Sequence, residues 1–319
     1  MANAAIRLHA RRTDDDNWET MISIYRSLLF APGNNARMVE KCVNAGADAV
    51  ILDLEDAVAV AQKSGTRDLV VKALALPRRC KAYVRVNALG TEWCFRDLDA
   101  ITVKGLDGIV LPKTEHANDL ITVDWMLRSL EKERGMPEGG IDVIPLIETA
   151  LGFTHLHAIA RANRRIRRIA FGAGDFTLDL GMSWSDGESE LLPYRSAFVV
   201  ESRAAGLEPP IDTALGKLEQ PAIFEATARH AMELGFQGKL CIHPSQVKSA
   251  NKIFRPSDSE VLKARRITEA FDDAEARGLA ALTVDGQFVD YPIAHRARAI
   301  VARAERISAA EAADLSTSP

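Results

Sequence analysis

Eight short apolar or β-rich runs recur along the chain, and their even spacing limits the fold more than any other feature. Their starts lie about 30 residues apart, which is the length of one β–α unit. Most are continuously apolar, as strands buried on both faces of a parallel sheet are. The runs are residues 27–30, 49–53, 82–86, 108–111, 142–147, 168–171, 210–212 and 239–242.

The stretches between these runs have the pattern of helices. Apolar residues recur at helical spacing in residues 35–45, and Gly46 follows as a helix stop. Residues 116–133, 189–205 and 222–234 also end at or just before a glycine. Strands that alternate with helices imply an α/β protein with a parallel sheet. Eight such units predict a (β/α)8 TIM barrel rather than an open doubly wound sheet.

The chain of 319 residues suits one large domain with a small appendage. We expect a mobile N-terminal tail over residues 1–22, because this stretch is charged and lacks an apolar run typical of a secretory signal. The barrel is predicted over residues 23–255. A C-terminal segment, residues 256–319, follows a proline that interrupts the chain.

The C-terminal segment has the pattern helix, hairpin, helix. Residues 259–277 and 293–307 are the predicted helices, and residues 283–292 form a turn-rich run between them. The pair Asp285-Gly286 is typical of a two-residue hairpin turn. The final residues, 315–319, are expected to be disordered.

Composition excludes several classes of function. The net charge of −4 gives no general attraction to nucleic acid or to an anionic membrane. No apolar run approaches the length of a membrane span. The four cysteines form no C-x-x-C pair and no disulfide framework, which favours a reducing cytoplasm. We therefore expect neither nucleic acid nor a membrane as a partner.

The active site of a TIM barrel lies at the C-terminal ends of its strands. Glu148 and Asp175 follow neighbouring predicted strands, where no cysteine or histidine pair accompanies them. Two carboxylates in this setting suit Mg²⁺, which binds one or two carboxylates together with water and substrate oxygens. The alternative is that they cap a helix or pair with Arg85.

Two basic residues also end predicted strands. Arg85 could bind a substrate carboxylate through its planar fork, or form a structural ion pair with Glu55 or Asp53. Lys113 could form a Schiff base with a carbonyl substrate, which would make the chain a metal-free aldolase. The alternative for Lys113, which we favour, is a salt bridge or a phosphate contact.

The glycines of Gly172-Ala173-Gly174 do not indicate a dinucleotide site. Thr177 stands where the third glycine of that fingerprint would be. We expect these glycines to allow a close approach of the backbone to a ligand, or a tight turn.

Eight motifs in order resemble the citrate lyase β-subunit-like (CitE-like) family of the HpcH/HpaI aldolase superfamily, which includes malyl-CoA and citramalyl-CoA lyases. The resemblance covers residues 26–302. The motifs are RSLLFAPG (26–33), DLEDAV (53–58), VRVN (84–87), LPK (111–113), LIETA (146–150), FGAGD (171–175), GKLCIHPSQV (238–247) and FRPS (254–257).

The resemblance implies a role for each matching residue. Glu148 and Asp175 match two ligands of Mg²⁺, for which Mn²⁺ could substitute. Arg85 matches the arginine that holds the carboxylate of an oxo acid and stabilises developing negative charge. Glu55, with Asp56, matches acids close to the metal's water ligands.

Further residues of the matched motifs are candidates for binding substrate. These are Ser27, Pro32, Gly33 and Gly174, in addition to Arg85.

The resemblance also assigns the C-terminal segment. DGQFVDYP (285–292) matches a lid, and Asp290 matches the catalytic aspartate of that lid. In the family this lid closes over the barrel of a neighbouring subunit, usually in a trimer. The implied assembly is therefore a homo-oligomer in which Asp290 acts on its neighbour.

The implied function is a Mg²⁺-dependent carbon–carbon lyase. It would cleave a hydroxyacyl-CoA such as malyl-CoA, citramalyl-CoA or citryl-CoA to a 2-oxo acid and an acyl-CoA. Alternatives are a citrate lyase β subunit that depends on an acyl-carrier protein, a malyl-CoA thioesterase and a catalytically silent barrel. Residues 181–189, with Met182 and Trp184, lie in a variable loop that could reshape the acyl pocket.

Overall fold

The computed structural model describes residues 23–316, so the predicted tail over residues 1–22 lies outside the described part of the chain. The chain divides into two compact units, one of residues Tyr25–Phe254 and one that contains the residues from Arg255 onward. Within the described residues, no helix is long and apolar enough to cross a membrane.

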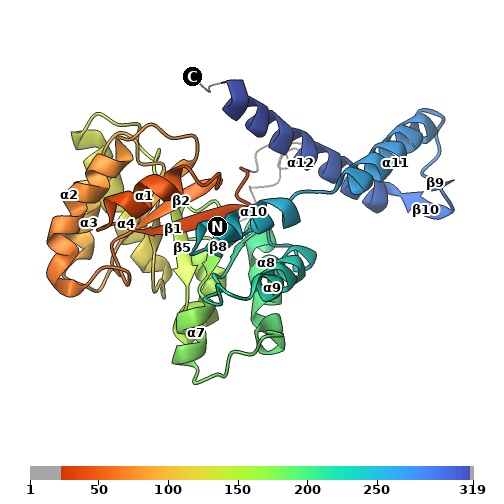
Figure 1. Cartoon of the computed structure of the whole chain (residues 1–319). Coiled ribbons are helices and arrows are strands. Elements are labelled where there is room, and N and C mark those ends of the chain that lie inside the picture. The colour runs from red at the N-terminus through yellow and green to blue at the C-terminus, as the bar shows by residue number, and fades with distance from the viewer. Residues whose placement is uncertain (1–22, 317–319) are drawn as a thin grey trace, which may run out of the picture. The chain divides into compact units, whose positions relative to one another are not determined.

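The first unit is a closed barrel of eight parallel strands, β1 to β8 in chain order (Figure 1). The register is continuous: Leu28 of β1 pairs with Ala49 of β2 and with Leu240 of β8. This arrangement confirms the predicted (β/α)8 barrel. The strands are Ser27–Pro32, Ala49–Asp53, Lys81–Arg85, Gly108–Leu111, Asp142–Ile147, Ala170–Phe171, Ile211–Asp212 and Gly238–Cys241.

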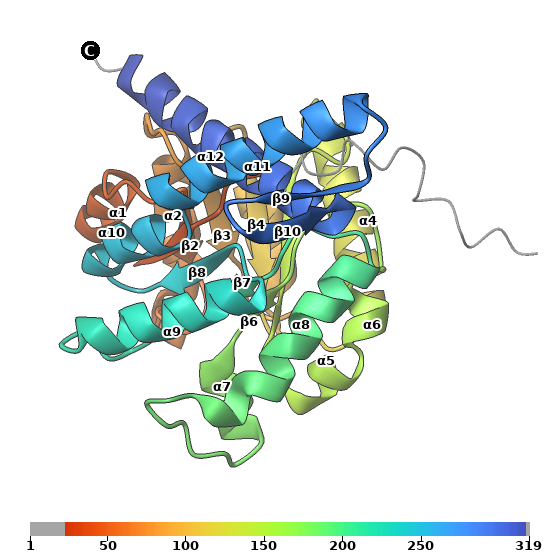
Figure 2. The same cartoon turned by 90° about the vertical axis from the view of Figure 1, so that its right-hand side faces the viewer.

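Helices cover the outside of the barrel (Figure 2). The first of these are α1 (Ala36–Val43), η2 (Val60–Gln62), α2 (Lys63–Leu74), α3 (Cys94–Ile101), α4 (Ala117–Glu133), α5 (Ala150–Thr154) and α6 (Leu156–Ile159). Those that follow are α7 (Ala173–Asp179), η3 (Ser189–Leu191), α8 (Leu192–Ala204), α9 (Pro221–Leu234) and α10 (Pro244–Ile253). The helix predicted over residues 189–205 therefore begins with a 3-10 turn, and the α-helix proper starts at Leu192 with Pro193 in its first turn.

The barrel is filled by side chains and closed at the N-terminal ends of its strands. Apolar residues such as Ile51 and Ile144 occupy the interior. At the closed end, Tyr83 bridges two groups: its hydroxyl lies 2.7 Å from the Tyr25 hydroxyl and donates to Asp142 Oδ2 at 2.7 Å. Arg168 pairs with Asp142 and packs over the Tyr25 ring. This buried cluster leaves the opposite end of the strands for a site.

The second unit consists of α11 (Asp258–Ala276), the antiparallel hairpin β9 (Ala281–Val284) and β10 (Gln287–Asp290), and α12 (Tyr291–Ser316). Asp285 and Gly286 have φ of 51° and 77°, as a two-residue hairpin turn requires, which confirms the predicted turn. Phe271 and Val289 belong to a separate small core.

Helix α12 differs from the prediction at both ends. Tyr291 and Pro292 begin the helix instead of belonging to the turn-rich run. Proline is favoured in the first helical turn, where its missing N–H is not needed. The helix also continues to Ser316, whereas the sequence predicts disorder from residue 315. Residues 317–319 lie outside the described part.

Candidate active site

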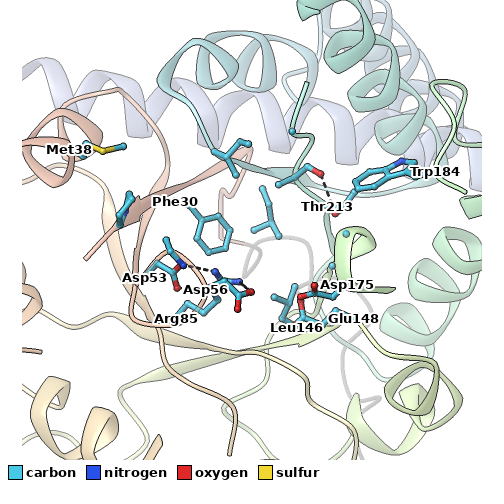
Figure 3. Close-up of a pocket in the computed structure, with 18 residues that line it drawn as sticks. Phe30, Met38, Asp53, Asp56, Arg85, Leu146, Glu148, Asp175, Trp184 and Thr213 are labelled. Atoms are coloured by element: carbon cyan, nitrogen blue, oxygen red, sulfur yellow. Dashed lines mark hydrogen bonds and ion pairs between the residues drawn. The ribbon is translucent and has the colours of Figure 1, made fainter. Parts of the chain in front are cut away.

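A cavity of about 530 Å3 opens at the C-terminal ends of the barrel strands (Figure 3). Its charged lining residues are Asp53, Asp56, Arg85, Glu148 and Asp175. The other lining residues are Phe30, Pro32, Met38, Ala57, Leu146, Gly172, Gly174, Trp184, Thr213, Ala214, Gly216, Leu240 and Ile242. The position agrees with the end of the barrel at which the sequence places the site.

Glu148 and Asp175 lie next to each other in this cavity (Figure 3). Glu148 follows β5 and is 3% exposed, and its Oε1 accepts a hydrogen bond from Lys113 N at 2.9 Å. Asp175 stands in the first turn of α7, directly after β6. Burial, and then the negative charges of Glu55 and Asp175, raise the pKa of Glu148 from 4.5 to about 8. Burial and the neighbouring carboxylates both disfavour the charged form of Glu148.

Gly172 allows β6 to approach Glu148 closely. A Cβ at this position would lie only 2.7 Å from both Oε2 and Cβ of Glu148. Any side chain here would displace the carboxylate into the cavity or out of its pocket. The G-x-G pattern predicts a close approach or a turn rather than a dinucleotide site, but it does not identify Glu148 as the neighbour.

The two carboxylates fit a hard divalent cation. The described residues contain no group of three or more histidine, cysteine, aspartate or glutamate side chains arranged around a metal position. Mg²⁺ does not need one, because it keeps several waters and binds through one or two carboxylates. A cation between Glu148 and Asp175 would offset both the burial of the Glu148 charge and the repulsion between the carboxylates. The donor set and its charge therefore suit Mg²⁺.

Arg85, the last residue of β3, is held in place by carboxylates. Its Nε and Nη2 donate to Asp53 Oδ1 and Oδ2 at 2.7 and 2.6 Å. Its Nη1 lies 3.0 Å from Glu55 Oε2 and 3.7 Å from Asp56 Oδ2. The guanidinium also packs over the Phe30 ring, 4.9 Å from its centroid. Burial opposes the charge, but the hydrogen bonds and charges of the carboxylates hold the pKa of Arg85 above its usual range.

Both structural ion pairs considered for Arg85 are thus present. This arrangement does not exclude contact with substrate, because Arg85 also lines the cavity.

Glu55 and Lys113 form an ion pair beside Arg85. Lys113 Nζ donates to Glu55 Oε1 at 2.7 Å, as the salt-bridge alternative predicts. Burial raises the pKa of Glu55, while Arg85 and Lys113 oppose that effect. Burial would lower the pKa of Lys113, but Glu55 outweighs it and the pKa is raised. A Schiff-base lysine needs a lowered pKa, so Lys113 is poorly suited to that chemistry.

A buried polar network beneath the site was not predicted from the sequence. Lys63 Nζ donates to the carbonyl oxygens of Leu54 and Glu55, both at 2.9 Å, and to Asn87 Oδ1 at 2.6 Å. Asn87 Nδ2 in turn donates to Asp97 Oδ2 at 2.6 Å. The network fixes the backbone that carries Glu55. Its members are far apart in sequence, so only the fold reveals them.

The four other candidate substrate-binding residues are placed differently. Pro32 and Gly174 line the cavity. Gly33 does not: its N–H donates to Asp53 O at 2.9 Å, and a Cβ would collide with that oxygen at 2.6 Å. Ser27 is the first residue of β1, at the opposite end of the barrel, and its hydroxyl donates to Asn251 Oδ1 at 2.7 Å. Neither Gly33 nor Ser27 is among the residues that line the cavity.

Asp290 belongs to the second unit. It is the last residue of β10, and its Oδ1 accepts a hydrogen bond of 3.3 Å from Ile293 N in the first turn of α12. The carboxylate therefore caps that helix.

The sequence matches a protein-family model and curated relatives over most of its length. Residues 26–244 match the HpcH/HpaI aldolase/citrate lyase family. The chain is 38% identical to the citrate lyase subunit beta of Escherichia coli K12, over 88% of this chain and 93% of that one. It is 35% identical to the L-malyl-CoA/beta-methylmalyl-CoA lyase of Cereibacter sphaeroides (strain ATCC 17025), over 89% and 96%.

Solved structures agree with these matches. The chain superposes on protein CitE from Mycobacterium tuberculosis in complex with magnesium, acetoacetate and coenzyme A. The TM-score is 0.73 at 30% sequence identity, covering 89% of this chain and 99% of that one. The predicted family is thereby confirmed: the chain belongs to the HpcH/HpaI aldolase/citrate lyase family, and it is a lyase of that family.

Proposed function

We propose that this protein is a Mg²⁺-dependent lyase that cleaves a carbon–carbon bond in a hydroxyacyl-CoA thioester. The products are a 2-oxo acid and an acyl-CoA. The observation that carries the proposal is the convergence of Glu148, Asp175 and Arg85 in one cavity. The relatives named as lyases, and the neighbour that contains magnesium and coenzyme A, support it.

Glu148 and Asp175 would hold the cation. When bound, Mg²⁺ supplies a positive charge that lowers the pKa of the substrate hydroxyl and stabilises the oxygen left by proton loss. Arg85, which lines the cavity, would bind the substrate carboxylate and stabilise the same developing charge. Asp53 and Glu55 keep the guanidinium in position.

Proton movements involve two further carboxylates. Asp56 lines the cavity with its side chain 56% exposed, and it would accept the hydroxyl proton. The electrons of the O–H bond then form the carbonyl of the 2-oxo acid. Those of the broken carbon–carbon bond pass to the α-carbon of the thioester, where the carboxyl group of Asp290 delivers a proton. In the condensation direction the same groups act in reverse.

We also propose that the protein is a homo-oligomer, with trimers as the unit, in which Asp290 serves the barrel of a neighbouring subunit. The resemblance of residues 285–292 to a family lid supports this arrangement. A reducing cytoplasm is the proposed location, in keeping with the free state of Cys42, Cys80, Cys94 and Cys241.

The decisive experiment offers malyl-CoA, citramalyl-CoA and citryl-CoA separately to the purified chain with Mg²⁺. Released 2-oxo acid is trapped as its phenylhydrazone, with and without EDTA. EDTA-sensitive release is the expected result. Cleavage of a thioester only when it is carried by an acyl-carrier protein would identify a carrier-dependent β subunit. Release of malate with no 2-oxo acid would identify a thioesterase.

A further inference from the structure

Trp184, in the loop between α7 and η3, forms one wall of the cavity. A Cβ built on Gly174 would lie 4.0 Å from Trp184 Cζ3, so the indole packs beside the residue that precedes Asp175. Figure 3 shows the ring bordering the end of the cavity that holds Asp175 and Glu148. The indole N–H donates to Glu188 Oε1 at 2.9 Å. The ring thus presents an apolar surface to the cavity.

A chain of buried charges holds this wall in place. Glu188, only 1% exposed, pairs through Oε2 with Arg195 Nη2 at 2.7 Å. Arg195 Nε donates to Asp212 Oδ1 at 2.8 Å, and Asp212 also accepts from Lys239. The side chains of Arg195, Asp212 and Lys239 are completely buried. The loop is therefore tied through Glu188 to α8, β7 and β8, and the hydrogen bond from the indole N–H joins Trp184 to this buried chain.

Acidic side chains outnumber basic ones in the cavity lining. Among the described residues that line it, four are carboxylates (Asp53, Asp56, Glu148 and Asp175), and Arg85 is the one cation. The proposed function uses Arg85 for the carboxylate next to the reacting carbon. A second carboxylate on the same fragment would find no further cation among the described lining residues, and the indole N–H of Trp184 is already bonded to Glu188. An unpaired charge in such a place is strongly unfavourable.

We propose that Trp184 is a specificity-determining residue, and that it restricts the enzyme to thioesters that release a 2-oxo acid with one carboxylate and a small substituent. In these substrates, the small substituent on the carbon that bears the hydroxyl group is a hydrogen atom or a methyl group. A carboxymethyl group is rejected both by its charge and by the fixed ring. This inference rests on the proposed function and names its substrate class.

Binding of free 2-oxo acids tests the inference without turnover. In the presence of Mg²⁺, glyoxylate or pyruvate should raise the melting temperature of the wild-type chain, and oxaloacetate should not. Equal stabilisation by oxaloacetate would overturn the proposal. The Trp184→Ala variant should gain stabilisation by 2-oxobutyrate, which carries one more methylene than pyruvate.

Turnover gives the second test. One methylene in an apolar pocket changes kcat/KM about 10- to 200-fold. Trp184→Ala should therefore raise the kcat/KM ratio of the ethyl-substituted to the methyl-substituted thioester by about tenfold or more. An equal change for both substrates would show that Trp184 has only a structural role.

Two variants serve as controls. Trp184→Phe keeps a ring but loses the N–H that donates to Glu188, so its ratio should shift in the same direction by less. Trp125→Ala removes a tryptophan on α4 that is 67% exposed, and the ratio should stay unchanged.

The outcomes separate this inference from the proposed function. EDTA-sensitive cleavage of citryl-CoA as fast as that of citramalyl-CoA would keep the lyase and reject the role of Trp184. Selective binding of pyruvate over oxaloacetate with no cleavage of any thioester would keep the pocket assignment and reject the lyase reaction.

Discussion

Arg85 and Asp53 form a two-point ion pair between the last residues of neighbouring strands. The parallel register pairs these two positions directly, and their side chains meet at 2.6 and 2.7 Å. Asp53 is itself fixed by the backbone N–H groups of Glu55 and Ala57, both at 3.0 Å. The guanidinium of Arg85 is thus oriented before substrate binds, which reduces the reorganisation needed during the reaction.

Replacement of Arg85 by lysine tests the importance of this orientation. Lysine keeps the charge but lacks the planar fork, so it cannot both hold Asp53 at two points and bind a carboxylate. We expect kcat to fall about 10²- to 10³-fold, the usual effect of losing one oriented donor to a developing anion. Steady-state kinetics measure the effect, and Mg²⁺ binding by calorimetry should stay close to that of the wild type. A fall of less than about fivefold would remove Arg85 from the proposed mechanism.

The raised pKa of Glu148 predicts how pH affects the metal-free protein. Its carboxyl group has a pKa of about 8 in the folded chain, against 4.5 normally, so the folded state binds a proton more tightly than the unfolded state. Stability should therefore fall as pH rises from about 4.5 to about 8. Mg²⁺ must displace that proton, so its affinity should rise with pH over the same range and level off above it.

Urea unfolding and calorimetry at several pH values check this prediction. Glu148→Gln removes the titrating group, so this variant should lose the pH dependence contributed by position 148 and bind Mg²⁺ far more weakly. An unchanged Mg²⁺ affinity in Glu148→Gln would contradict the assignment of this residue as a ligand.

Asp290 is predicted to be the acid that protonates the thioester carbon. In the Asp290→Asn variant the amide side chain can still cap α12, because asparagine is also a good N-cap residue. We therefore expect the variant to keep the fold. Substrate binding should persist while turnover falls at least about a hundredfold. Asp290→Asn and Arg85→Lys subunits can be dissociated, mixed and reassembled. The mixture should recover part of the activity, because an intact barrel of one subunit can then meet the intact Asp290 of its neighbour. Failure of the mixture to recover would argue against action on a neighbouring subunit.

Asp212 is predicted to be important for stability. Alanine at this position would leave Arg195 and Lys239 buried without their shared carboxylate. Removing one member of a buried ion pair costs about 3–5 kcal/mol of unfolding free energy. The matched control is Asp272→Ala, which removes an exposed partner of Arg298 and should cost less than about 1 kcal/mol. Comparable losses for the two variants in urea unfolding would contradict the prediction.

The strands could be predicted because most of their residues are buried on both faces of the sheet. Residues 49–53, 108–111 and 142–147 match the observed strands at both ends. For β6 the sequence pattern predicts a start at Arg168, two residues early. Arg168 turns its side chain into the closed end of the barrel, where it pairs with Asp142, so the chain joins the ladder only at Ala170. Short strands give a weak pattern, and tertiary contacts decide their ends.

The site was predictable only in part, for a similar reason. The barrel fold alone predicts that residues at the C-terminal ends of strands, such as Glu148 and Arg85, lie in the site. The pairing of Glu188 with Arg195 depends on how a loop folds back onto a helix, and no sequence pattern encodes it. Ser27 is a candidate for substrate binding only because it belongs to a matched motif, and it starts its strand at the far end of the barrel.

The cluster of Tyr25, Tyr83, Asp142 and Arg168 closes one end of the barrel, and the consequence is kinetic. A pocket with a single mouth cannot release two products in any order. In the proposed reaction the smaller acid would bind between Arg85 and the acidic residues at the strand ends, beneath the long thioester. The acyl-CoA would then leave first, and in condensation the acid would enter first. We therefore expect product-inhibition patterns of a strictly ordered reaction, because one end of the barrel is closed.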